Sequence, residues 1–358
     1  MTREPKYQAL SEKLRYLIAG GEIEEGHALP TEYELAAQYG LSRQTVRQAI
    51  AQLEQDGLVR RLRGSGTYVH HGPRKAGGVR LASVITTYIT DYIFPSIVRG
   101  AESVFSHNGV LMTLSATYNQ TDTEKSLLEQ ALRQGADGLL IEGTQTALPN
   151  PNLALYEELR RRNIPFVMIN GFYPELHSCT RVLMDDEMGG WMAAQYLIEK
   201  GHTKIGGIFK NDDMQGRLRR QGFSRALDSA GIPLPEENLL WFSTQTREAF
   251  LDDSGLPFFS ALPALSAVVC YNDQIAVGLI NRARQMGILV PDDLSVISFD
   301  DSAFASVCSP GLTSLRHQKE AAGRLAAQKL LAMMNGEQQE SACLPWTISE
   351  RESVQTLK

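Results

Sequence analysis

The chain has 358 residues, of which 43% are hydrophobic and 21% charged, a composition that excludes disordered and collagen-like proteins and a length that suits two or three domains. The formal net charge is −6, yet residues 1–75 carry 11 Lys and Arg against 9 Asp and Glu, which predicts that this end alone meets a polyanion. No apolar run has the length of a membrane span and the first residues contain no apolar segment typical of a secretory signal, so we expect a cytoplasmic protein with no membrane partner.

The first seventy residues predict a winged helix-turn-helix. Apolar residues at helical spacing over 7–18 predict a first helix. Thr31 and Glu34 have the spacing of a capping box, which predicts the start of a second helix, and Ser42 is a good N-cap for a third. The glycine-rich turn at 64–66 lies between β-prone segments and predicts a hairpin, the wing.

The third helix and the wing carry side chains suited to DNA. The polar residues expected on the exposed face of this helix are Arg43, Gln44, Thr45, Arg47 and Gln48. Arg pairs with guanine edges, Gln with adenine, and the Thr methyl contacts thymine. The arginines of the wing, Arg60, Arg61 and Arg63, are expected to contact phosphates. A solvated helix face is the alternative interpretation, but the fold, the capping and the local positive charge together favour DNA binding.

The segment from Pro30 to Val69 resembles the signature of GntR-type bacterial regulators. The resemblance implies that residues of the third helix contact an operator, that Glu32 lies at the interface, and that the wing glycines approach the minor groove. The candidate DNA-binding residues are therefore Glu32, Ser42, Arg43, Gln44, Thr45, Arg47, Arg63, Gly64 and Gly66. Two-fold symmetry of a homodimer would place two recognition helices on successive major grooves, so we expect an approximately palindromic operator in double-stranded DNA.

Residues 71–78 combine Gly, Pro and charge without apolar periodicity and predict a linker between a domain over 1–70 and a domain over 79–358. From Val79 onward β-prone runs alternate with amphipathic segments. The predicted strands are 79–87, 110–117, 138–142, 165–170, 204–209, 267–271 and 294–300, and the helices between them include 95–107, 122–134, 187–200, 216–230 and 272–286. This rhythm is typical of α/β proteins with parallel sheets, in one large sheet or in two sub-domains with a cleft.

Polar and aromatic residues follow the predicted strands, where open α/β sheets bind ligands. They are Tyr92, Glu142, Asn170, Asn272, Asp273, Asp300 and Asp301. Carboxylates and amides make paired hydrogen bonds to adjacent hydroxyl groups, and Tyr92, Phe172 or Phe242 could lie against a sugar ring. Capping of the following helix is an equally good interpretation for Asp273 or Asp301.

The segments 185–206, 219–223, 271–301 and 310–317 are similar to the effector domain of LacI/GalR-type repressors and periplasmic sugar-binding proteins. This resemblance covers 79–358 and implies a periplasmic-binding-protein-like fold of two α/β sub-domains, which binds an effector and forms dimers. The positions that match the family's effector contacts are Glu142, Asn170, Arg219, Asn272, Asp300 and His317, with Phe242 or Trp241 as a stacking ring. Our candidate effector residues are these, with Phe242 as the ring, together with Tyr92 and Phe172.

The segment from Thr86 to Ile97, and the joining of a GntR-type head to this body, resemble the arabinose-responsive repressors of Gram-positive bacteria. The resemblance implies a repressor that L-arabinose releases from DNA. A repressor of another sugar, or a co-repressor mode in which the ligand tightens DNA binding, remains open. An enzyme is disfavoured because no P-loop, G-x-S-x-G or H-E-x-x-H motif occurs and because adjacent aspartates at a strand end point to opposite faces. The four scattered cysteines predict neither disulfides nor a metal site, and no cofactor is expected.

Overall fold

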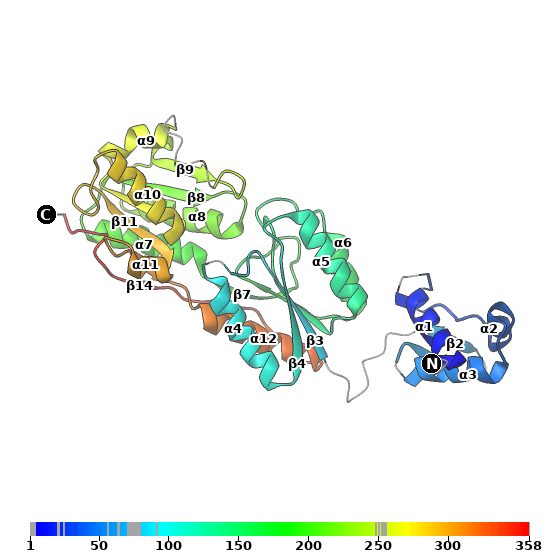
Figure 1. Ribbon diagram of the computed structural model, residues 1–358. Coiled ribbons are helices and arrows are strands. Elements are labelled where there is room, and N and C mark those ends of the chain that lie inside the picture. Colours follow the sequence, from blue (N-terminus) through cyan, green and yellow to red (C-terminus); the bar gives the residue numbers. More distant parts are fainter. Residues whose placement is uncertain are drawn as a thin grey trace. The chain divides into compact units, whose positions relative to one another are not determined.

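The computed structural model describes residues 5–19, 22–23, 26–55, 57–62, 65–69, 80–90, 92–247, 249, 251 and 256–357 (Figure 1). The chain divides into two compact units, one holding the chain up to Arg80 and the other nearly all of it from Leu81 onward. The predicted linker over 71–78 lies outside the described residues, as do Arg63 and Gly64 of the wing.

The smaller unit, the head, is the predicted winged helix-turn-helix. Its elements are α1 (Lys6–Ala19), α2 (Glu32–Tyr39), α3 (Arg43–Gln55), β1 (Val59–Leu62) and β2 (Gly66–Val69). The capping box is confirmed, because the Glu34 amide donates to the Thr31 hydroxyl and the Glu34 carboxylate accepts from the Thr31 amide. The Ser42 hydroxyl accepts from the Thr45 amide at 3.1 Å at the start of α3. Strands β1 and β2 pair antiparallel, as expected for a wing.

A small apolar core holds the head together. The spacing of Leu10, Leu14 and Ile18 on α1 and of Val46 and Ile50 on α3 places all five side chains on the inward faces, where each is at most 5% exposed. The polar positions between Val46 and Ile50 face outward for the same reason. The helical period therefore decides which residues of α3 are free to meet a partner.

The larger unit contains two lobes, each with a six-stranded sheet among its described residues. The N-lobe sheet has the order β13-β7-β6-β5-β3-β4. Its strands are β3 (Arg80–Thr86), β4 (Val110–Ala116), β5 (Gly138–Glu142), β6 (Phe166–Ile169), β7 (Thr180–Met184) and β13 (Ala342–Leu344). One face is covered by α4 (Phe94–His107) and α12 (Lys319–Met334), the other by α5 (Thr121–Gln134) and α6 (Leu153–Arg161). Helices α4 and α12 cross closely, because a Cβ on Gly323 would lie 2.0 Å from the Ile97 carbonyl oxygen.

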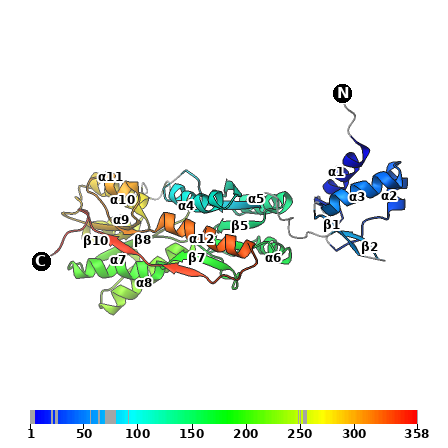
Figure 2. The same ribbon diagram turned by 90° about the horizontal axis from the view of Figure 1, so that it is seen from below.

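The C-lobe repeats this plan with the sheet order β14-β12-β11-β10-β8-β9. Its strands are β8 (Ile205–Lys210), β9 (Leu239–Phe242), β10 (Ala267–Cys270), β11 (Ser295–Asp300), β12 (Thr313–Arg316) and β14 (Thr347–Ser349). Its α-helices are α7 (Asp186–Glu199), α8 (Met214–Ser229), α9 (Pro257–Ala261), α10 (Asp273–Gln285) and α11 (Ala303–Val307), with short 3-10 turns at Glu236–Asn238 and Leu262–Ala264. Figure 2 shows α7 and α8 on the opposite side of this sheet from α10 and α11.

Three chain crossings connect the lobes, after β7, after β12 and after β13. They all leave from one edge of the N-lobe sheet, formed by β13 and β7, or from the matching edge of the C-lobe sheet, formed by β12 and β14. The open question of one sheet or two is thereby decided: the chain builds two sheets. The carboxyl ends of their parallel strands face a common cleft. No described helix is long and apolar enough to cross a lipid bilayer.

Candidate effector cavity and DNA-binding surface

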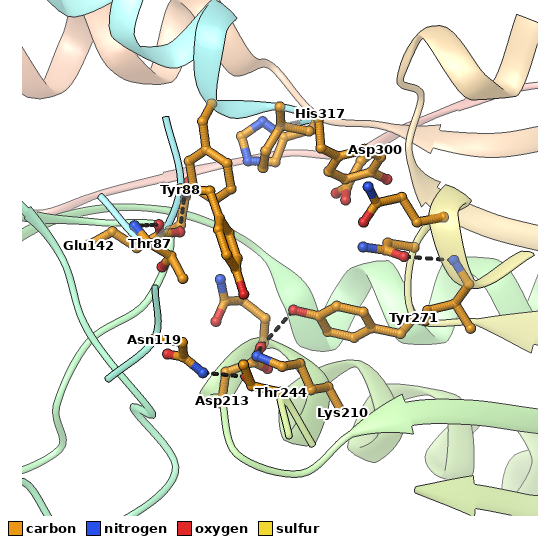
Figure 3. A pocket seen from close by; sticks show the side chains of 18 of the residues that line it. Thr87, Tyr88, Asn119, Glu142, Lys210, Asp213, Thr244, Tyr271, Asp300 and His317 are labelled. Carbon is orange, nitrogen blue, oxygen red and sulfur yellow. Dashed lines mark hydrogen bonds and ion pairs between the residues drawn. The ribbon is translucent and has the colours of Figure 1, made fainter. Parts of the chain in front are cut away.

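A cavity of about 100 Å³ lies in the cleft, where loops after the strands of both lobes meet (Figure 3). The predicted effector residues that line it are Tyr92, Glu142, Asn170, Arg219, Phe242, Asn272, Asp300 and His317. Tyr92, Asn170 and Asp300 have positive φ angles of 66°, 62° and 95°, which non-glycine residues rarely adopt. Asn170 and Asp300 lie at the ends of β6 and β11 and Tyr92 lies just before α4, and such backbone strain is commonly found at functional sites.

Arg219 is the centre of the C-lobe side of the cavity. Its Nε donates to Asp186 Oδ1 at 2.8 Å, its Nη1 donates to the Tyr271 carbonyl oxygen at 2.7 Å, and its Nη2 lies 3.7 Å from Asp300 Oδ1. The guanidinium also lies 4.4 Å from the centre of the Phe299 ring. Arg219 is only 4% exposed, so these partners replace the water that its charge would otherwise require.

The pKa values of Asp186, Asp300 and Arg219 are set by burial and by the attraction of both carboxylates to the Arg219 guanidinium. Burial raises the pKa of Asp186 to about 6, although the charge of Arg219 opposes the rise. Burial also raises the pKa of Asp300, again against the charge of Arg219. Although burial disfavours its charge, the carboxylates of Asp186 and Asp300 raise the pKa of Arg219 further, so the guanidinium remains charged.

Two polar atoms of the cavity have no hydrogen-bond partner from the described residues. They are Asp300 Oδ1 and His317 Nδ1, which are both buried and belong to residues 4% and 5% exposed. Burial and the charges of Lys319 and Arg219 lower the pKa of His317 to about 3, so the imidazole is neutral at pH 7. Buried polar atoms are nearly always paired, and a ligand with hydroxyl groups would satisfy both.

The N-lobe side of the cavity is built around Glu142. Its two carboxylate oxygens accept from the Thr87 amide at 2.8 Å and from Asn170 Nδ2 at 2.9 Å, and burial raises its pKa. Tyr92 reaches across to the C-lobe, where its hydroxyl donates to the Phe299 carbonyl oxygen and accepts from the Asp273 amide. The N-lobe therefore presents one fixed carboxylate and a bridging aromatic side chain to a ligand.

The aspartates for which capping was the alternative have other roles. Asn272 is the residue that caps α10, because its Oδ1 accepts from the Ile275 amide. Asp273 accepts from Ser298, Ser302 and Ser314 and is 0% exposed. Asp301 points away from the cavity and pairs with Arg316 and Arg351. Asp300 and Asp301 thus face opposite sides, as predicted, although both have positive φ angles and Asp301 follows the end of β11, so the turn and not strand alternation sets their directions.

In the head, the exposed residues of α3 include Arg43, Gln44 and Arg47. Glu32 accepts from Arg47 Nε and from Arg47 Nη2 at 2.9 Å, and Arg61 of the wing lies 3.5 Å from the same carboxylate. The hydrogen bond and charge of Arg47 lower the pKa of Glu32. Glu32 therefore orients a recognition-helix arginine and a wing arginine on one surface. Gly66 begins β2 with φ of 133°, a conformation that favours glycine.

Comparison with known proteins places this geometry in a family. The chain is 40% identical over 333 residues to the arabinose metabolism transcriptional repressor of Geobacillus stearothermophilus, with 92% of this chain and 91% of that protein covered. It is 36% identical over 343 residues to the protein of the same name from Halalkalibacterium halodurans, with 94% and 91% covered. The chain belongs to the family of arabinose metabolism transcriptional repressors.

Two segments of this repressor also match broader families. Residues 6–69 match the gntR family of bacterial regulatory proteins, and residues 194–354 match the periplasmic binding protein-like domain. Among solved structures, the transcription regulator CcpA of Lactococcus lactis shares the fold, with a TM-score of 0.69 at 24% identity over 78% of this chain and 100% of that one. These matches confirm the predicted architecture of a GntR-type head and a periplasmic-binding-protein-like body.

The structure of this repressor shows which of the predicted aromatic side chains line the cavity. Phe172 does not line the cavity: after the turn at Asn170 its ring lies 4.4 Å from the Arg181 guanidinium instead. Phe242 lines the cavity and is 1% exposed, whereas its neighbour Trp241 is 40% exposed on the other face of β9. Alternation along a strand allows only one of two successive rings to face the cleft.

Several residues that line this repressor's cavity were missed by the sequence reasoning. Lys210 donates to Asp213 Oδ2 at 3.0 Å, and the Tyr271 hydroxyl donates to the same oxygen at 2.6 Å (Figure 3). Although burial disfavours its charge, Asp213 and Asp212 raise the pKa of Lys210. The missed signal was positional, since Lys210 ends β8 and Asp213 follows it, in the same place as the polar residues found after other strands. Within the described residues, no group of three or more His, Cys, Asp or Glu could hold a metal ion.

Proposed function

We propose that this chain is a sequence-specific repressor of arabinose utilisation genes that leaves its operator when L-arabinose enters the cleft. Membership of a family of arabinose metabolism transcriptional repressors supports this proposal. The single observation that carries it is the cavity beside Arg219, in which Asp300 Oδ1 and His317 Nδ1 are buried without a hydrogen-bond partner among the described residues. A polyhydroxyl ligand offers both donors and acceptors to these groups.

The charge balance of the cavity favours a neutral ligand. Its lining includes the carboxylates of Glu142, Asp186, Asp213 and Asp300 and the cations of Lys210, Arg219 and Arg247. Asp186 and Arg219 pair with each other, and Asp213 pairs with Lys210. Because the wall holds four carboxylates against three cations, a phosphate or carboxylate ligand would meet no excess of positive charge. A pentose with neutral hydroxyl groups fits this environment better.

The DNA partner follows from the head. We assign operator contacts to Arg43, Gln44, Thr45 and Arg47 on α3 and to the wing, and assign the domain boundaries at 1–70 and 79–358. Glu32 and Ser42 support this surface, the first by orienting Arg47 and the second by capping α3. One head reads one half-site, so a homodimer would read an approximately palindromic operator in the cytoplasm. No catalytic step is assigned, because Asp300 and Asp301 point apart and cannot flank one bond.

Coupling between the effector cavity and the DNA-binding surface requires only a modest difference in operator affinity between the effector-free and effector-bound protein. A coupling free energy of about 1–3 kcal/mol would change operator affinity roughly 5- to 150-fold. A mobility-shift titration of an operator duplex, selected by binding from random DNA, measures this change as L-arabinose is added. We expect dissociation with L-arabinose. Tightening of the complex would establish a co-repressor instead, and a response to a different pentose in calorimetry would replace L-arabinose as the effector.

Two variants separate the sites in this assay. Arg43→Ala is expected to weaken operator binding while arabinose binding in calorimetry is unchanged. Arg219→Met is expected to bind the operator but to lose the response to arabinose. If the two phenotypes were exchanged, the assignment of the DNA-binding and effector sites would be wrong.

A further inference from the structure

The two lobes touch each other at the edge of the cleft opposite the chain crossings. The crossings leave from the edges formed by β13 and β7 and by β12 and β14, whereas β4 and β9 form the far edges of the two sheets. Loops after β4 and β5 of the N-lobe meet loops after β8 and β9 of the C-lobe at this far side. Figure 3 shows Asn119 and Thr244 approaching one another from opposite lobes. A cleft hinged at one edge opens only if contacts at the opposite edge break.

Direct hydrogen bonds cross the cleft there. The Met214 amide donates to Thr146 Oγ1 at 2.9 Å, and Asn119 Nδ2 donates to Thr244 Oγ1 at 2.5 Å. Asn119 Nδ2 also lies 3.4 Å from Asp212 Oδ2, which accepts from the Thr244 amide at 2.9 Å. Thr146, Asn119 and Asp212 are 1%, 3% and 6% exposed. We call these five residues the clasp.

Each half of the clasp is fixed within its own lobe. A Cβ on Gly143 would lie 2.6 Å from Thr146 Cγ2, so the loop after β5 packs tightly around this threonine. Asn119 Oδ1 accepts from the Gln145 amide at 2.8 Å, which joins the two N-lobe loops. On the other side, Asp213 caps α8 by accepting from the Gly216 amide at 2.7 Å. The clasp therefore joins two rigid surfaces, and its bonds report whether the cleft is closed.

The hydrogen bond of the Met214 amide shows whether the two lobes are in contact. Met214 is the first residue of α8, where an amide has no acceptor within the helix. Its partner is the Thr146 hydroxyl of the other lobe. When the lobes separate, this amide loses that bond and meets water. Neither Thr146 nor Met214 lines the cavity, so the contact can be changed without altering the surface that meets a ligand.

We propose that the clasp holds the cleft closed without effector and thereby sets the affinity of the cavity for its ligand, with Thr146 as a positioning residue. The cavity is lined by both lobes, so the closed state is the one that binds. Apparent affinity is the intrinsic affinity multiplied by the fraction of molecules already closed. The identity of the ligand used below rests on the proposed function, whereas the closed state of the free protein does not.

Three variants of the full chain test the clasp. Thr146→Val keeps the shape but removes the acceptor for the Met214 amide, and Thr146→Ser restores a hydroxyl. Thr180→Val is the matched control, because Thr180 is 8% exposed and donates to the Gln339 carbonyl oxygen within the N-lobe, at the end of β7 away from the cleft. Hydrogen exchange of the Met214 amide is measured without ligand, and L-arabinose affinity is measured by calorimetry.

In the effector-free wild type we expect a protected Met214 amide. Thr146→Val should accelerate its exchange and weaken arabinose binding, and the product of these two fold-changes should be about 2- to 12-fold, the change in the closed-to-open ratio on losing one hydrogen bond. Thr146→Ser and Thr180→Val should resemble the wild type in both measurements. Exchange of the wild-type amide at the rate of free peptide would show that no clasp forms. Accelerated exchange in Thr146→Val with unchanged affinity would overturn its role in setting affinity. Failure of the wild type to bind arabinose would refute the proposed effector, while the exchange measurement would still test closure.

Discussion

Substitution of Arg219 by Met tests whether this cation stabilises the ionised form of its buried carboxylate neighbours. Methionine keeps much of the side-chain volume against Phe299 and removes the guanidinium. With Arg219 present, the pKa of Asp186 is about 6, against a usual value of 3.8. Each unit of pKa difference corresponds to about 1.4 kcal/mol, so ionised Asp186 lowers the free energy of unfolding by about 3 kcal/mol at neutral pH.

Protonation of Asp186 limits how far the loss of Arg219 can lower the free energy of unfolding. Without the cation the pKa of Asp186 rises further, and the folded state then takes up a proton instead of burying the unpaired charge. If the carboxyl group becomes fully protonated, the added destabilisation equals the free energy of protonation from its present pKa, which is about 2 kcal/mol at pH 7.5. At pH 5.5 Asp186 is largely protonated in both proteins, and this contribution falls to about zero. Stability lost through Arg219→Met should therefore shrink as the pH falls.

Tryptophan fluorescence during urea unfolding can measure this difference in the relevant lobe. The three tryptophans of the chain, Trp191, Trp241 and Trp346, lie on α7, on β9 and just before β14, all in the C-lobe. The matched control is Arg217→Met, which removes an exposed arginine from the same helix. We expect the difference in free energy of unfolding between wild type and Arg219→Met to become smaller from pH 7.5 to pH 5.5. The control should show a small difference that does not depend on pH. An equal difference for Arg219→Met at both pH values would refute the electrostatic reasoning.

Three further predictions concern the head and the packing of the C-lobe. Arg43→Ala should weaken specific operator binding by about 1–3 kcal/mol and flatten base preference at one position, as measured by mobility shift with single-base operator variants. Arg60→Ala should weaken binding to all duplexes alike and reduce the slope of log K against log salt by about one; a change confined to one sequence would contradict a phosphate contact. Gly222→Ala should destabilise the C-lobe by about 1–3 kcal/mol, because its Cβ would lie 1.8 Å from the Glu187 carbonyl oxygen of α7, whereas the exposed neighbour Gln221→Ala should have little effect on the thermal midpoint.

Local sequence patterns predicted the elements of the head and seven strands of the larger unit, but they did not predict β7, β9, β12, β13 or β14. The capping box at Thr31 and Glu34 and the apolar period of α1 involve residues within one or two helical turns, so the chain carries these signals locally. The predicted strand over 138–142 coincides with β5 and the predicted helix over 122–134 with α5. Helix α12 was not predicted, since Ala and Gly form much of its buried side and give a weak apolar pattern. Its small residues are explained only by the close crossing with α4.

The amino-acid sequence by itself determined which residues end the strands and therefore which polar groups could meet in a cleft. Only the tertiary structure decided that two sheets share this cleft, that Phe242 rather than Phe172 faces it, and that Lys210 and Asp213 belong to it. Helix caps and apolar periods depend on neighbours along the chain, whereas the bonds of Arg219 to Asp186 and of Met214 to Thr146 join distant segments. The first exists only after the C-lobe has folded and the second only after the lobes have closed, and no local pattern encodes either.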